Sequence, residues 1–184
     1  VPPLDQKVEC GFVTVPEDRT AAGSATIRLH IAVVKSKSLD AASDPVVYLE
    51  GGPGAKALGL ARLSFAPYYS PFLNNRDFIM FDQRGVGFSE PALDCPEYVA
   101  FSYDILDEGL SVNEATDGSV EAVERCRDHL LATGVDLRAY TSAESAADVN
   151  DIRVALGYDE WNLYRISYGT KLALTVMRNH PEGV

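Results

Sequence analysis

Hydrophobic and polar side chains alternate in the first part of the chain. Residues 26–34 place isoleucine, leucine or valine at every second position, and residues 11–15 have a similar character. Pro16 and a short Ala-Gly-Ser stretch separate the two segments, as the turn of a hairpin would. Period-two alternation is typical of a strand that buries one face. The sequence therefore predicts an antiparallel pair of strands near its beginning.

Later in the chain the alternation gives way to short, continuous apolar runs. They lie at residues 45–49, 77–81 and 161–166, and a glycine-containing segment follows each run. Runs without alternation suit strands that are buried on both faces, as in a parallel sheet covered by helices. The sequence therefore predicts three such strands.

Helical patterns lie between the last two runs. Residues 119–132 carry apolar side chains at helical spacing, namely Val120, Val123, Cys126 and Leu130. Thr141 and Glu144 have the spacing of a capping box, which opens a second helix that Gly157 closes. Helices that alternate with apolar strands predict an α/β fold, with a mostly parallel sheet flanked by helices and antiparallel first strands.

Composition and charge exclude several classes of function. The 184 residues carry 16 Lys and Arg against 27 Asp and Glu, a net charge of −11, which argues against a nucleic-acid partner because phosphate binding needs cationic side chains. No apolar run approaches the roughly 20 residues of a membrane span. Three scattered histidines and the absence of a CxxC motif predict no metal site. We also expect no cofactor, since the glycine spacing fits neither a dinucleotide site nor a P-loop.

The three cysteines leave two interpretations open. Cys95 and Cys126 are 31 residues apart and could form one disulfide, which would favour an oxidising compartment. The alternative is three buried thiols. The first residue is Val1 and not Met, which suggests that an N-terminal segment has been removed or left out. Together these features favour an extracellular or cell-envelope location, with the cytoplasm as the alternative.

The most informative position for chemistry is Ser167. It follows the apolar run at 161–166 and is followed at once by Tyr168, Gly169 and a helical pattern. A serine at such a turn is raised above the sheet, where backbone N–H groups and the helix dipole favour an oxyanion. This is the geometry of a nucleophile elbow. The alternative is that Ser167 is a simple N-cap, a position that serine favours.

Two glycine-containing loops follow the other buried strands. In Gly51–Gly54, clustered glycines allow backbone N–H groups to approach a ligand closely, although a tight turn is the alternative. The second loop covers Asp82–Ser89. Asp82 and Arg84 could form an ion pair that shapes a turn near the site, and we assign them scaffold roles.

Together the segments Glu50–Gly54, Asp82–Ser89 and Ser167–Gly169 resemble the α/β-hydrolase fold, and more narrowly its proline iminopeptidase and tripeptidyl aminopeptidase-like branch. The resemblance implies that Ser167 is the nucleophile and that the N–H of Tyr168 is one oxyanion donor. It implies Gly52 as the other donor, with Gly51 as the fallback. The reaction implied is acyl transfer to water.

The sequence departs from the family pattern at two points, and both affect what we expect of the catalytic residues. Arg165 stands where the family has the first glycine of the elbow. The triad acid and histidine should follow the serine, yet only His180 does, roughly 20 Å away along the helix, while His30 and His129 lie on an early strand and a helix. We therefore expect residues 1–184 to be the N-terminal portion of a single core domain. A C-terminal fragment of the same precursor, or a second chain, would supply the later strands, a cap, the Asp and the His.

The resemblance implies an aminopeptidase that acts on short peptides. Such enzymes need a carboxylate for the α-ammonium group of the substrate, and Glu50 is a conceivable contributor, although it could equally be only a loop residue. A carboxylesterase using the same serine is one alternative. A non-catalytic binding protein derived from a hydrolase is another, motivated by Arg165 and the missing triad members.

Overall fold

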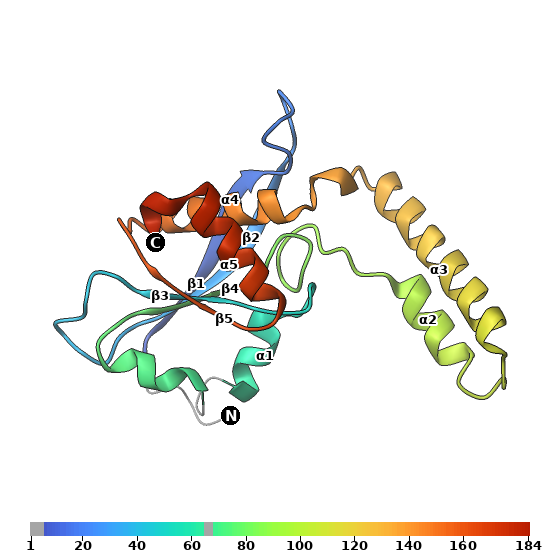
Figure 1. Ribbon diagram of the computed structural model, residues 1–184, viewed down its shortest axis with the longest axis horizontal. Helices are drawn as coiled ribbons and strands as arrows, with labels where there is room; N and C mark the ends of the chain where they lie inside the picture. The colour runs from blue at the N-terminus through green and yellow to red at the C-terminus, as the bar shows by residue number, and fades with distance from the viewer. Residues whose placement is uncertain (1–5, 65–67) are drawn as a thin grey trace. The chain divides into compact units, whose positions relative to one another are not determined.

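The computed structural model describes residues 6–64 and 68–184 (Figure 1). The chain forms two compact units. The first combines residues 1–92 with residues 139–184 and contains the sheet, and the second covers residues 93–138 and is helical. Each unit is described by itself below.

The first unit is built on a five-stranded sheet of order β1-β2-β4-β3-β5. β1 (Val8–Pro16) and β2 (Thr26–Val34) pair antiparallel over their whole length, which confirms the predicted hairpin. β2 then pairs antiparallel with β4 (Phe78–Phe81). The expected combination of antiparallel first strands and a parallel centre is therefore confirmed.

The parallel part consists of β4, β3 (Val46–Leu49) and β5 (Asn162–Arg165). Every residue of β3 and β4 is buried, as their continuous apolar runs predict. β5 differs, because it pairs with β3 on one side only and its residues are mostly exposed. A position at the sheet edge explains why this strand is not buried on both faces.

Helices cover both faces of the sheet. α4 (Ser142–Ala155) and α5 (Tyr168–Asn179) pack on one face, where the larger core cluster includes Val149, Ile152 and Leu172. On the other face α1 (Ala57–Ser64) and the 3-10 helix Ser70–Asn74 belong to a smaller cluster that contains Tyr48 and Tyr69 (Figure 1). Two further 3-10 helices are Leu137–Ala139 and Pro181–Gly183.

The second unit is a pair of helices, α2 (Pro96–Asp104) and α3 (Val112–Ala132). A disulfide joins Cys95 to Cys126, whereas Cys10, in the first unit, is an exposed free thiol. The first of the two interpretations of the cysteines therefore holds in this structure. None of the helices in the described part combines the length and apolar character needed to cross a bilayer.

Two details of the helical prediction were wrong. The helix expected at 119–132 begins at Val112, because Ser111 and Glu114 form a full capping box there. Its buried residues include Ala122 in place of the exposed Val120 and Val123, since the inward face follows i, i+4 spacing with Cys126 and Leu130. The second correction concerns the start of α4. Only half of that capping box forms: the Thr141 hydroxyl accepts the Glu144 N–H, while the Glu144 carboxylate binds Arg19.

Candidate active site

Ser167 occupies a sharp turn between β5 and α5. Its φ of 50° and ψ of −121° make it the one non-glycine residue with positive φ among residues 6–64 and 68–184. A backbone in this region is strained and persists only where its surroundings hold it. The Ser167 side chain is exposed and makes no cap hydrogen bond. The hydroxyl therefore does not serve as an N-cap, although the residue holds the N-cap position.

Two glycines allow the turn to pack closely on β3. A Cβ atom at Gly169 would overlap the carbonyl oxygen of Leu49, so α5 can begin here only because this residue has no side chain. A Cβ atom at Gly51 would lie 2.9 Å from the Ser167 Cβ and 3.5 Å from its Oγ. The structure thus brings the loop after β3 directly against the Ser167 side chain.

In the loop after β3, the N–H groups of Gly51 and Gly52 differ in their hydrogen bonding. The N–H of Gly51 donates to Oε1 of Glu50 over 2.7 Å. The N–H of Gly52 has no partner within the described residues, and its φ of 109° favours glycine. The N–H of Tyr168 also has no hydrogen-bond partner among the described residues. The hydroxyl of Tyr168 forms a hydrogen bond with the hydroxyl of Ser142 over 2.9 Å. The described residues thus leave two N–H groups unbonded, one directly after Ser167 in sequence and one in the loop whose Gly51 packs against Ser167.

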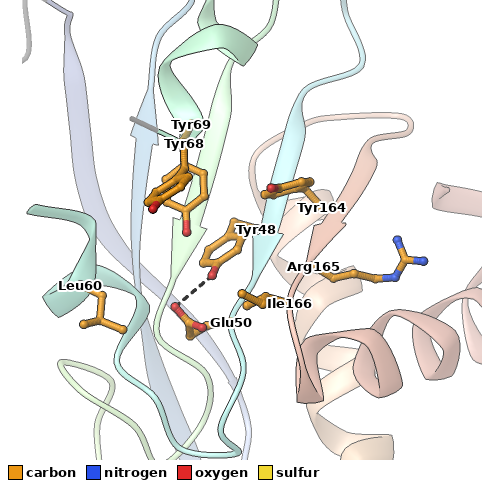
Figure 2. Close-up of a pocket in the computed structure, with 8 residues that line it drawn as sticks. All are labelled: Tyr48, Glu50, Leu60, Tyr68, Tyr69, Tyr164, Arg165 and Ile166. Atoms are coloured by element: carbon orange, nitrogen blue, oxygen red, sulfur yellow. Dashed lines mark hydrogen bonds between the residues drawn. The ribbon is translucent and has the colours of Figure 1, made fainter. Parts of the chain in front are cut away.

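Arg165 takes the position at which the family pattern has a glycine. Its side chain is exposed, and Figure 2 shows it pointing away from the tyrosines and Glu50. Because the side chain extends outward, the strand-to-helix turn forms without a small residue here. The strained φ of Ser167 is present in the same structure.

The side chains of Asp82 and Arg84, in the loop after β4, form hydrogen bonds with other segments of the chain and within the loop. The carboxylate of Asp82 accepts the N–H of Leu58 over 3.0 Å and the N–H of Phe88 over 2.9 Å, and the residue is fully buried. Arg84 forms a bidentate pair with Asp148 at 2.7 Å for both bonds. The ion pair predicted between Asp82 and Arg84 was wrong, because backbone N–H groups satisfy the former and α4 supplies the carboxylate for the latter.

A cavity of about 500 Å³ opens beside this arrangement, on the face that carries α1 (Figure 2). Glu50 is 9% exposed and lies on its wall, where Oε2 accepts the hydroxyl of Tyr48 over 3.1 Å. Burial, followed by hydrogen bonding with Tyr69 and the charge of Glu50, raises the pKa of Tyr48. The phenol therefore stays protonated and remains a donor to the carboxylate. Eight described residues line the cavity: Tyr48, Glu50, Leu60, Tyr68, Tyr69, Tyr164, Arg165 and Ile166.

The structure does not bring the three histidines together with Ser167. His30 lies on β2 and contacts Phe12 and Phe88, and His129 is paired with a glutamate within the helical unit. His180 caps the other end of α5, about 18 Å along a helix of 12 residues. In the described ranges, no group of three or more His, Cys, Asp or Glu side chains has an arrangement suited to a metal ion.

Comparison with known proteins identifies the family. Residues 44–184 match the family described as the alpha/beta hydrolase fold. The chain belongs to this family. It is 29% identical over 188 residues to the tripeptidyl aminopeptidase of Streptomyces coelicolor, an alignment that covers 98% of this chain and 34% of that protein. It is 28% identical over 192 residues to the serine protease Hip1 of Mycobacterium tuberculosis, with 95% of this chain and 34% of that protein covered.

Solved structures agree on the α/β-hydrolase fold. A proline iminopeptidase-related protein from Thermus thermophilus superposes with a TM-score of 0.53 at 21% identity, over 96% of this chain and 42% of that one. The proline iminopeptidase of Mycobacterium smegmatis gives the same TM-score at 17% identity, over 94% and 41% of the two chains. The chain spans about a third of the length of the two curated relatives named above.

Sequence reasoning missed the tyrosine wall of the cavity. A signal was present, because Tyr48 stands two residues before Glu50 at the end of one strand, and Tyr164 stands two residues before Ile166 at the end of another. The two tyrosines are register partners in the parallel pairing of β3 with β5. Equivalent positions at the carboxyl ends of parallel neighbours point to one face of the sheet.

Proposed function

We propose that this chain carries the nucleophile and oxyanion hole of a serine hydrolase that cleaves short peptides from their N-terminus. The observation that carries the proposal is the strained turn at Ser167, with the loop of Gly51 and Gly52 packed on its side chain. The names of the relatives, a tripeptidyl aminopeptidase and a serine protease, support a peptide as the substrate class.

In this proposal Ser167 Oγ attacks the carbonyl carbon of the scissile bond, and its proton passes to a general base. The carbonyl oxygen becomes an oxyanion that accepts the N–H groups of Gly52 and Tyr168. The amine leaves with the proton, and water then hydrolyses the acyl-enzyme. Gly51 is the weaker candidate as donor, because its N–H already bonds to Glu50. Loss of one donor typically lowers turnover by about 10²–10³.

The base and acid of the triad are proposed to come from a further polypeptide segment. The histidines described above do not meet Ser167, and in this fold both residues follow the nucleophile in chain order. We propose that a C-terminal fragment of the same precursor or a second chain supplies the histidine, the aspartate and the strand that pairs with the open edge of β5. Denaturing mass spectrometry of the active preparation tests this: a single species near 20.0 kDa would contradict it.

A fluorophosphonate probe tests the nucleophile directly. We expect one equivalent to modify Ser167 in the complete active protein, and Ser167→Ala to abolish both labelling and hydrolysis, with a loss of about 10⁴ or more in kcat. Ser102→Ala, at a partly exposed serine of α2, is the matched control and should retain both. Unlabelled protein with a correctly folded turn would favour the binding-protein alternative, which Arg165 motivates.

Paired substrates separate the peptidase from the carboxylesterase that uses the same serine. We expect higher kcat/KM for aminoacyl or tripeptidyl anilides than for p-nitrophenyl esters of N-acylated or simple carboxylic acids. The reverse order would support the esterase. Both outcomes require Ser167, so the label distinguishes a wrong substrate class from a wrong nucleophile.

Export from the cytoplasm is also proposed, on the strength of the disulfide between Cys95 and Cys126. Thiol titration of unfolded protein isolated from its host should find one free thiol, that of Cys10, and three after reduction. Three free thiols before reduction would favour the cytoplasm.

A further inference from the structure

A second cavity, of about 310 Å³, lies in the first unit, where the N-terminal ends of α4 and α5 meet the loops after β3 and β4. It differs in charge from the cavity beside Glu50. The described residues of its wall include Arg84 and Lys171 but no aspartate or glutamate, in a chain whose net charge is −11. The wall of this cavity is therefore cationic in an acidic protein.

The two cations of the wall differ in their partners. Arg84 forms a bidentate pair with Asp148, so its charge is balanced. Glu144, the other acidic residue in the first two turns of α4, pairs with Arg19. The ammonium of Lys171, an exposed residue of α5, has neither a hydrogen bond nor a carboxylate partner within the described part of the chain. Lys171 therefore brings an unbalanced positive charge to the edge of the cavity.

Ser145 contributes a buried hydroxyl to the same wall. The residue is only 8% exposed, and its side chain has no hydrogen-bond partner among the residues that the structure describes. The neighbouring hydroxyls differ, because that of Ser142 bonds to Tyr168 and that of Thr141 accepts the N–H of Glu144. Buried polar side chains in folded proteins are nearly always hydrogen-bonded. The hydroxyl of Ser145 is therefore a donor available to a bound molecule.

Two helices begin at this cavity. α4 has 14 residues and α5 has 12, and the first residue of each, Ser142 and Tyr168, lines the wall. The first N–H groups of a helix have no acceptor within it, and the positive end of the helix dipole favours an anion there. The helix ends therefore favour the same sign of ligand charge as Lys171.

We propose that this cavity binds a small carboxylate ligand, with Lys171 as the counter-charge and Ser145 as a hydrogen-bond donor. A carboxylate carries one negative charge and accepts hydrogen bonds at both oxygens, which matches one unbalanced ammonium and one free hydroxyl. The inference goes beyond the proposed function, because such binding needs neither the nucleophile nor the general base.

The cavity borders the candidate active site. Tyr168 directly follows Ser167, and Gly54 lies two residues after Gly52, and both Tyr168 and Gly54 line the wall. The bound carboxylate can therefore come from either of two sources. It is the free C-terminus of a peptide substrate, or it belongs to a separate small acid that binds beside the substrate.

Four variants separate charge from hydrogen bonding. Lys171→Gln removes the charge and keeps a polar side chain at an exposed position, whereas Lys171→Arg keeps the charge. Ser145→Ala removes only the hydroxyl. Lys37→Gln is the matched control, because Lys37 is an exposed lysine outside the cavity. Thermal unfolding of each variant verifies that it is folded.

Binding is measured in the complete protein by NMR titration, with sodium acetate against acetamide at constant ionic strength. We expect acetate to bind at least tenfold more tightly, with shift changes at the first turns of α4 and α5. Lys171→Gln should remove most of this preference and Ser145→Ala should reduce it, whereas Lys171→Arg and Lys37→Gln should retain it. Equal affinity for the two probes, or a preference that survives Lys171→Gln, would overturn the proposal.

Hydrolysis then identifies the source of the carboxylate. The substrates are short alanine peptides with a free C-terminus and the same peptides as C-terminal amides. A higher kcat/KM for the free acids that Lys171→Gln abolishes assigns the C-terminus of the substrate. Equal values for acids and amides, with acetate bound, assign a separate small acid.

The same measurements keep the two proposals apart. Hydrolysis that needs Ser167, in a protein that does not prefer acetate to acetamide, refutes the carboxylate site and leaves the hydrolase. Acetate binding that depends on Lys171, in a protein whose turnover survives Ser167→Ala, refutes the proposed nucleophile and leaves the carboxylate site.

Discussion

The loops after β3 and β4 leave the sheet at the same edge, since these strands are parallel, yet they use their backbone differently. In the loop after β4, the N–H groups of Asp82, Val86, Phe88 and Ser89 all donate to acceptors within the protein. In the loop after β3, the N–H of Gly51 is bonded, whereas that of Gly52 has no partner in the described part of the chain. The loop after β4 is thus tied to the rest of the protein by several backbone and side-chain hydrogen bonds, and the loop after β3 keeps at least one backbone donor unbonded.

This is the difference that we expect between a scaffold loop and a loop of the proposed site. Gly52 is exposed, so its unbonded N–H is accessible to a ligand, whereas buried backbone groups need partners within the protein. The scaffold loop holds its neighbour in place through Gln83, whose amide donates to the carbonyl oxygen of Glu50 over 3.0 Å. The contrast predicts that damage to the second loop lowers stability, whereas damage at the contact between Ser167 and the first loop lowers activity most.

The largest effect is expected for Gly169→Ala. Its new Cβ would overlap the carbonyl oxygen of Leu49 and lie 3.1 Å from that of Glu50, so α5 must move away from the end of β3. Overpacking of this kind costs about 1–3 kcal/mol or more. A displacement near 1 Å at the nucleophile can cost about 10² in rate. Denaturant unfolding and kcat/KM for the preferred anilide measure the two effects.

Gly11→Ala is the control for this comparison. A Cβ at Gly11, on β1, meets no atom within 4 Å, so both stability and activity should remain near those of the parent protein. If Gly169→Ala kept full activity with an intact fold, the close contact between α5 and β3 would not be what positions Ser167.

The next largest effect is expected for Arg84→Met, in the scaffold loop. The change removes both bonds to Asp148 and the donors to the carbonyl oxygens of Glu17 and Ala139. Breaking one partner of a buried pair costs about 3–5 kcal/mol. We expect the lower part of that range, because Arg19 still pairs with Asp148. The free energy of unfolding from urea titration measures the loss.

The matched control for Arg84→Met is Arg127→Met. Arg127 pairs with Asp128 on the surface of α3, where exposed pairs contribute little, so we expect no measurable change. Measuring the turnover of Arg84→Met adds a second test of the role of this loop. If Arg84→Met retained its stability but lost turnover, the loop after β4 would belong to the site and not to the scaffold.

The sequence predicted the elements that depend on local pattern. The hairpin of β1 and β2, the buried β3 and β4, and the turn that follows β5 all come from spacing that a single segment carries. The exposed edge of β5 did not follow from its own sequence, because burial depends on what lies beside a strand and not on the strand alone.

Side-chain partners far apart in sequence were the least predictable part. Asp82 and Arg84 are two residues apart, and an ion pair was expected between them. Arg84 pairs instead with Asp148, which lies 64 residues further along the chain. The bond between Glu50 and the N–H of Gly51 is local but depends on the φ and ψ of the loop. Sequence proximity identifies candidates for a bond, whereas the backbone geometry decides which bond forms.

The smallest effect is expected for a change of Asp77, a titratable residue that directly precedes β4, at the end opposite to the scaffold loop. Burial opposes its charge, but hydrogen bonds from Lys35, the N–H of Ser36 and Tyr158 outweigh burial and lower its pKa from 3.8. A lowered pKa in the folded state contributes stability above about pH 4, and this is lost as pH falls through the folded value.

Asp77→Asn should therefore be less stable than the parent protein near pH 6, by about 1 kcal/mol because Lys35 is partly exposed, and the difference should shrink steadily below pH 4. Lys35→Met should lose stability in the same pH range by removing the cation. Urea unfolding at a series of pH values measures both. A difference that does not change with pH would mean that the hydrogen bonds at Asp77, and not its charge, stabilise this end of the strand, as they do for the buried loop at the other end.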